Sequence, residues 1–221
     1  MSALYAIPTP LGGSPQDALS PSTIQTIRGL RRFVVENAKT ARAFLAALDM
    51  PVRELTIEEI GDNRLGGDDI GLLSEAGCPA IADPGAKLIE AAHAAGYKVV
   101  PLVGPSSIVM ALMASGLEGQ RFAFCGYLPR EPAERKKRIR ELENRSRKEA
   151  ETEIFIETPY RNDALLAALL ESCAESTRLC VAIDLTLPSE TIRTAPVREL
   201  RKKPFPIGKR PAVFLLLAQH R

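Results

Sequence analysis

Residues 70–107 read IGLLSEAGCPAIADPGAKLIEAAHAAGYKVVPLVGPSS, and the fold is best worked out from this stretch. Residues 70–73 are a short apolar run that ends at turn residues, which predicts a buried strand. Asp83 is the expected N-cap of the helix that follows, with Pro84 at its first position. Residues 97–103 predict a second strand. This order is typical of a parallel sheet, which binds ligands at the carboxyl ends of its strands.

Working outward, the chain predicts an α/β protein of two domains. The first half is expected to form a parallel sheet. In the second half strands are denser and helices scarcer, which predicts a mixed sheet. The boundary is expected near a charged segment, giving domains 1–127 and 128–221. Further strands are expected at 4–7, 33–35, 122–126, 153–157, 179–185, 190–195 and 213–218.

Three segments of the first half have weaker patterns. Residues 15–21 predict an irregular connection, and Ser22 is the expected cap of a helix over 23–30. Residues 53–65 are polar and weakly patterned, so no covering helix is expected there, which is unusual for a parallel sheet.

Composition is that of an ordinary globular protein. The chain has 221 residues, 45% hydrophobic and 25% charged, with a net charge of +2, so no overall bias toward nucleic acid or membrane follows. We expect no signal peptide and no membrane span, because no apolar run approaches the ~20 residues required. Four cysteines without a C-x-x-C pair and two histidines disfavour a zinc site. We therefore expect no metal and reduced thiols in a cytoplasmic protein.

Residues 130–148 are rich in Lys and Arg interleaved with Glu. This segment is interpreted either as a solvated helix with i,i+4 pairs or as a positive surface that touches phosphates. Standard catalytic motifs are missing: there is no G-x-G-x-x-G after the first strand, no P-loop and no Ser/His/Asp set. What remains is a soluble α/β protein with a ligand crevice and scattered carboxylates at strand ends, namely Glu36, Glu75, Asp83, Glu157 and Asp184.

Taken together, the strand-end loops resemble those of the tetrapyrrole methylase superfamily of S-adenosylmethionine-dependent methyltransferases. The likeness is strongest to the branch that methylates the ribose 2′-hydroxyl of a cytidine in bacterial small-subunit ribosomal RNA. The matching segments are PTPLG at 8–12, SEAGCP at 74–79, ADPG at 82–85, VGPS at 103–106, FCGYLP at 124–129 and ETPYR at 157–161.

The resemblance implies a two-domain fold with S-adenosylmethionine folded in the cleft between the domains, usually in a homodimer. It implies RNA or the small ribosomal subunit as partner and no membrane. The general base is not identified, and the candidate catalytic residues are Glu36, Glu75 and Glu157. The implied donor-binding residues are Pro8, Leu11, Ala82, Asp83, Pro84, Ser106, Ser107, Thr158, Pro159, Ala182 and Pro211.

The chain departs from the branch pattern at polar positions on the acceptor side. Residues 36–39 read ENAK where the branch has E-D-T-R, and residues 55–59 read LTIEE where the branch has a His-Glu pair. Residues 158–161 read TPYR in place of S-P-H-R, and residues 183–187 read IDLTL in place of R-E-L-T-K. Three hypotheses therefore stay open: an RNA methyltransferase, a methyltransferase of the same fold with a small-molecule acceptor, and a donor-binding protein without catalysis.

Overall fold

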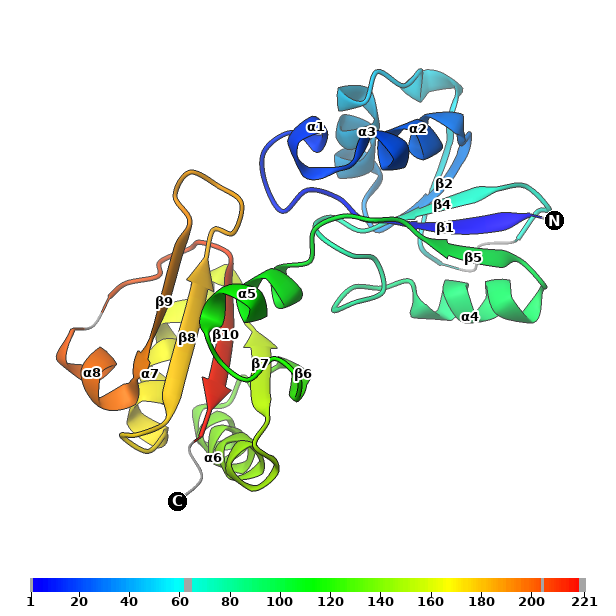
Figure 1. Ribbon diagram of the computed structural model, residues 1–221. Helices are drawn as coiled ribbons and strands as arrows, with labels where there is room; N and C mark the ends of the chain where they lie inside the picture. The colour runs from blue at the N-terminus through cyan, green and yellow to red at the C-terminus, as the bar shows by residue number, and fades with distance from the viewer. Residues whose placement is uncertain (1, 62–64, 204, 219–221) are drawn as a thin grey trace. The chain divides into compact units, whose positions relative to one another are not determined.

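The computed structural model describes residues 2–61, 65–203 and 205–218. They form two compact units that divide between Ser106 and Ser107 (Figure 1). Each unit has its own five-stranded sheet. Among the described residues, none of the helices combines the length and apolar character that crossing a membrane requires.

The sheet of the first unit has the strand order β3-β2-β4-β1-β5, and all its pairings are parallel. Helices α1, α2 and α3 cover one face and α4 the other (Figure 1). The strands are β1 Ala3–Ile7, β2 Arg32–Val35, β3 Thr56–Glu59, β4 Ile70–Leu73 and β5 Lys98–Pro101. The helices are α1 Pro15–Ala18, α2 Pro21–Gly29, α3 Ala38–Ala47, η1 Val52–Glu54 and α4 Ala86–Ala94.

Alternation along β2 shows how this sheet is packed. Phe33 and Val35 point into the cluster beneath α2 and α3, and Val34 points into the smaller cluster beneath α4. Strand β4 lies between β2 and β1 and is buried along its whole length, as its uninterrupted apolar sequence predicted. The predicted parallel sheet is thereby confirmed.

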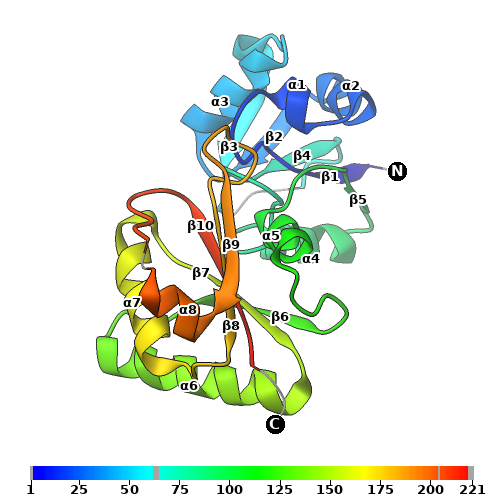
Figure 2. The same cartoon turned by 60° about the vertical axis from the view of Figure 1, so that its left-hand side comes forward.

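The sheet of the second unit has the order β6-β7-β10-β8-β9 and is mixed, as predicted: β6 and β7 are parallel and the other pairs antiparallel. Helices α6, α7 and α8 supply its main core, whereas α5 lies on the other side of the sheet from α7 (Figures 1 and 2). The strands are β6 Phe122–Tyr127, β7 Thr152–Ile156, β8 Arg178–Ile183, β9 Thr191–Pro196 and β10 Ala212–Leu217. The helices are α5 Ser107–Ser115, α6 Pro132–Glu149, η2 Pro159–Arg161, α7 Asn162–Ser172 and α8 Val197–Lys202.

The division between the units falls earlier than the boundary expected between 127 and 128. Strand β6 pairs with β7, so it belongs to the second sheet although it directly follows the helix that we assigned to the first domain. Strand pairing joins residues far apart in sequence, and the local pattern around residue 127 carries no information about it.

Local elements also differ from the expectation at three places. Helix α4 begins at Ala86, with Gly85 as its cap at φ 128°, so Asp83 lies in the preceding loop and is not the N-cap. Residues 15–18 form the short α1, and Ser20 rather than Ser22 caps α2, accepting from the Thr23 N–H at 3.2 Å. Strand β3 lies in the segment without a clear pattern, because an edge strand buries only part of its side chains.

Candidate functional site

Three loops of the first unit are joined at the carboxyl edge of its sheet. Thr9, after β1, and Gly77, after β4, exchange backbone hydrogen bonds of 2.9 and 3.0 Å. The Cys78 thiol donates to the Pro105 carbonyl, after β5, at 3.4 Å. Gly104 lies so close to Pro8 that a Cβ there would be 2.5 Å from the proline ring. The three loops therefore form one structure, at the edge where parallel sheets bind ligands.

Several predicted donor-binding residues lie in these joined loops. Pro8 is buried against Gly104, and Leu11 packs over Gly77, whose missing side chain leaves the space for it. Ser106 ends the third loop, close to the Cys78 thiol. The structure thus brings together residues that are distant in sequence, as the parallel-sheet argument requires.

The loop between β4 and α4 has an unusual backbone. Ala80 and Ala82 have positive φ angles of 64° and 65°, and Gly77 and Gly85 have angles of 80° and 128°. Left-handed conformations of non-glycine residues cost on the order of 1 kcal/mol or more and concentrate at functional sites. This strain places Ala82, Asp83 and Pro84 within a candidate ligand loop.

Carboxylates of three loops lie near one another at the same edge. Glu36 accepts a hydrogen bond from the Glu75 backbone N–H at 3.3 Å, and Thr40 on α3 donates to the Glu75 carboxylate at 3.4 Å. Partial burial, together with the negative charges of Glu36 and Glu75, raises the pKa of Asp83 to about 6. A site that resists a third negative charge in this way favours a cationic ligand.

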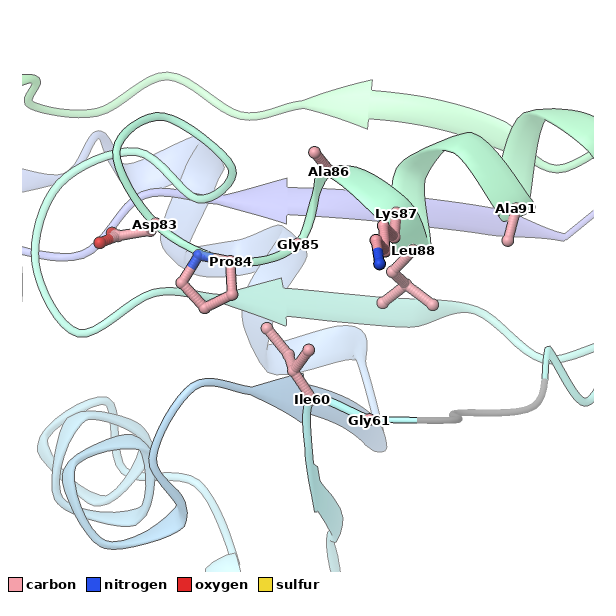
Figure 3. A pocket seen from close by; sticks show the side chains of 9 residues that line it. All are labelled: Ile60, Gly61, Asp83, Pro84, Gly85, Ala86, Lys87, Leu88 and Ala91. Carbon is pink, nitrogen blue, oxygen red and sulfur yellow. The ribbon is translucent and has the colours of Figure 1, made fainter. Parts of the chain in front are cut away.

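A pocket of about 570 Å³ opens beside the loop between β4 and α4. Figure 3 shows Pro84 and Ile60 on facing sides, with Asp83 at one end and Lys87 further along α4. Its lining residues are Ile60, Gly61, Asp83, Pro84, Gly85, Ala86, Lys87, Leu88 and Ala91. The size is in the range of small-molecule sites. We did not predict Ile60 and Gly61; recognising β3 as the fifth parallel strand would have placed them at the same edge.

The remaining candidates lie in the second unit, at the end of its sheet where β7 and β8 finish and β10 begins. Antiparallel pairing sets Val213 opposite both Ile156 and Ala182, which brings the start of β10 to this end. Thr158 and Pro159 follow β7, and Pro211 precedes β10. Ser107 is the first residue of α5, and Ala182 is buried within β8.

Glu157 has an asymmetric environment at this end. Its Oε1 accepts from the Thr158 N–H at 2.7 Å and from the Thr158 hydroxyl at 3.1 Å, and it pairs with Arg161. Its Oε2 is buried and has no hydrogen-bond partner among the described residues. The side chain is held firmly, with one oxygen left for a further donor. The role of Glu157, like those of Glu36 and Glu75, stays a prediction.

The described residues include no group of three or more His, Cys, Asp or Glu side chains that would hold a metal ion. The chemistry of the candidate site is that of backbone groups, small side chains and carboxylates.

Comparison with known proteins identifies the family to which the chain belongs. A family model described as Tetrapyrrole (Corrin/Porphyrin) Methylases matches residues 16–201. "Ribosomal RNA small subunit methyltransferase I" of Vibrio cholerae is 32% identical over 206 residues, covering 89% of this chain and 69% of the relative. The protein of the same name from Pseudomonas aeruginosa is 34% identical over 206 residues, covering 89% and 71%. The crystal structure of the methyltransferase CobJ covers 99% of this chain and 95% of its own, with a TM-score of 0.64 and 18% identity, and so shares the fold.

The family match and the fold together place the chain among methyl-transferring enzymes built of two α/β units. The chain belongs to the tetrapyrrole (corrin/porphyrin) methylases.

Proposed function

We propose that the protein transfers a methyl group from S-adenosylmethionine to a ribose 2′-hydroxyl of small-subunit ribosomal RNA. The observation that carries the proposal is the similarity, over 89% of the chain, to relatives named as small-subunit ribosomal RNA methyltransferases. The family model matches residues 16–201, which include the loops after β4 and β5 and the residues that follow β7. The proposal includes a cytoplasmic location for the enzyme.

Residues of the first unit suit the methyl donor. S-adenosylmethionine supplies an electrophilic methyl group on a sulfonium cation, and the carboxylates of Asp83, Glu36 and Glu75 favour a positive charge. The rigid joined loops hold the site in place, which matters because an in-line displacement depends on alignment. The attacking hydroxyl oxygen forms the new bond to carbon, the carbon–sulfur bond breaks toward sulfur, and the hydroxyl proton passes to a base.

The base is a carboxylate in this proposal, with Glu36, Glu75 and Glu157 as the candidates. Exchanging each for glutamine keeps size and hydrogen bonding but removes the proton acceptor. The base is the residue whose variant loses kcat by about 100-fold or more while its dissociation constant for the donor is unchanged. A loss confined to donor binding would assign that residue to the donor site instead.

The test of the function is isotopic methyl incorporation into small-subunit particles purified from a strain that lacks this modification. Incorporation into ribose is the expected result. Donor binding without incorporation into RNA, but with turnover on a small molecule, would favour a small-molecule acceptor. Donor binding without turnover on any acceptor would favour a non-catalytic role.

We expect the affinity for S-adenosylmethionine to fall by about ten-fold as the pH drops through 6. Asp83 is charged above its pKa of about 6 and neutral below it, so the attraction for a sulfonium cation is present above this pH and lost beneath it. Calorimetric titration between pH 5 and 8 checks this. The neutral demethylated product is the matched control and should show little dependence, and D83N should remove the dependence for the donor.

We also propose that the protein forms a homodimer. Val109 and Met113, one turn apart on α5, are 48% and 79% exposed, and Phe122 on β6 is 45% exposed. Apolar surface of this kind commonly marks an association site. Sedimentation analysis should show a dimer, and M113E should shift it toward the monomer; a wild-type monomer at micromolar concentration would contradict the proposal.

A further inference from the structure

Arg135 is a buried cation for which the described residues offer no partner. It lies on α6, its side chain and backbone together are 8% exposed, and its Nε has no hydrogen-bond partner. Its guanidinium forms no ion pair either, among the described residues. Two other arginines of the unit have carboxylate partners: Arg161 pairs with Glu157, and Arg145 pairs with Glu153. Because an unpaired buried charge is costly, a missing anion is the simplest explanation.

The position of Arg135 in α6 places it near backbone N–H groups that could donate hydrogen bonds to the same anion. It is the fourth residue of α6, whose cap Glu131 makes no side-chain cap hydrogen bond. Pro132 has no N–H, and the N–H groups of Ala133 and Glu134 have no acceptor within the helix. A long side chain at the fourth position leans back over the first turn. We therefore expect the guanidinium to lie on the same side as the two N–H groups, in a helix of 18 residues whose dipole also favours an anion.

Nearby charges indicate which kind of anion fits. Arg130 and Lys137 are exposed and form no ion pair with a described residue, whereas Lys136 is engaged with Glu171 at 2.7 Å. Glu131 and Glu134, also exposed at this end, repel any anion in proportion to its charge. Arg130, Arg135 and Lys137 attract an anion in the same proportion, so charge alone does not separate a phosphodiester from free phosphate. A phosphodiester in a nucleic-acid strand can also reach the neighbouring cations.

We propose that Arg135 and the first turn of α6 bind one phosphodiester group of the RNA substrate. This inference rests on the proposed function and adds to it a positioning contact in the second unit. A phosphate contact fixes the register of a strand without reading its sequence. Arg135 is thus a positioning residue.

The test compares R135Q with R140Q by fluorescence anisotropy, using a single-stranded RNA oligonucleotide at 50 to 200 mM KCl. Arg140 lies on the exposed side of the same helix, so R140Q removes an equal charge. We expect R135Q to weaken binding about ten-fold and to lower the slope of log K against log[salt] by about 0.7, whereas R140Q changes affinity less than about two-fold. R135K should recover part of the lost RNA affinity, because lysine restores the positive charge but not the planar guanidinium group with its paired N–H donors.

Thermal unfolding of R135M gives an independent measure. Removing an unpaired buried charge should leave the midpoint unchanged or raise it. A clear fall would show that Arg135 has a structural partner and would overturn the inference.

The outcomes separate this inference from the proposed function. Equal RNA affinity for R135Q and R140Q overturns the phosphate site and leaves RNA methylation standing. If the wild-type protein binds donor but no RNA, the proposed function fails, and the phosphate site fails with it. If inorganic phosphate binds in an Arg135-dependent way while RNA affinity is unaffected, the site belongs to a small phosphate-bearing ligand, which also overturns the inference.

Discussion

Replacing Gly104 with alanine is expected to destabilise the first unit by about 2–3 kcal/mol and to weaken donor binding by about ten-fold or more. The new Cβ would lie 2.5 Å from Pro8 Cβ, 2.8 Å from Pro8 Cγ and 3.1 Å from a methyl group of Leu19. A proline ring cannot rotate away, so the loop after β1 or the loop after β5 must move. These are two of the three loops that form the candidate site.

The measurement is chemical denaturation together with calorimetric titration of S-adenosylmethionine. Gly29 provides a matched control in the same unit, because a Cβ there meets nothing within 4 Å. G29A should leave donor binding unchanged and not destabilise the protein, since alanine at the end of α2 is preferred over glycine. Wild-type stability and affinity in G104A would show that the loops are not held together as described.

The second large effect is expected in the second unit, where R145M should lower the free energy of unfolding by about 3 kcal/mol or more. Arg145 Nε donates to Glu153 Oε1 at 2.6 Å, and its Nη2 pairs with Glu153 Oε2. The Glu153 side chain is fully buried in β7. Methionine fills similar space but leaves the Glu153 carboxylate buried without its counter-charge. An uncompensated buried charge destabilises the folded protein more than the removal of both charges.

A double variant shows whether the uncompensated carboxylate causes this loss. The R145M/E153M double variant should recover most of the stability, because both charges are gone. R138M is the control: Arg138 pairs with Glu141 at the surface at 3.2 Å, and its removal should cost no more than about 0.5 kcal/mol. An R145M loss as small as the R138M loss would contradict the prediction.

The Arg145–Glu153 pair also bears on Cys125, which we expect to be unreactive. Burial and the neighbouring Glu153 raise the pKa of this thiol to about 11, although Arg145 opposes the shift. The thiolate, the nucleophilic form, is therefore scarce at neutral pH.

Local pattern was sufficient for most elements of the fold. The apolar run at 70–73 predicted the buried central strand β4, and the alternation of strand-rich and helix-rich segments predicted one parallel and one mixed sheet. The loop motifs were enough to recognise the family, because taken together they resemble the strand-end loops of its members.

Local pattern failed where a residue's role depends on a distant partner. Strand β3 has few buried side chains because it lies at an edge, so its sequence lacks a strong period. Asp83 reads as a helix cap, yet Gly85 takes that position and leaves Asp83 beside two other carboxylates.

From sequence alone, then, the protein is recognisable as two α/β halves, since hydrophobic period and turn residues act over a few positions of the chain, and the resemblance of its loops to a known family adds methyl transfer. Only the folded arrangement assigns β6 to the second sheet, raises the pKa of Asp83 and buries Arg135 with no partner for its Nε among the described residues. Each of these depends on long-range pairing and packing, which set the neighbours, the burial and hence the electrostatic environment of a side chain.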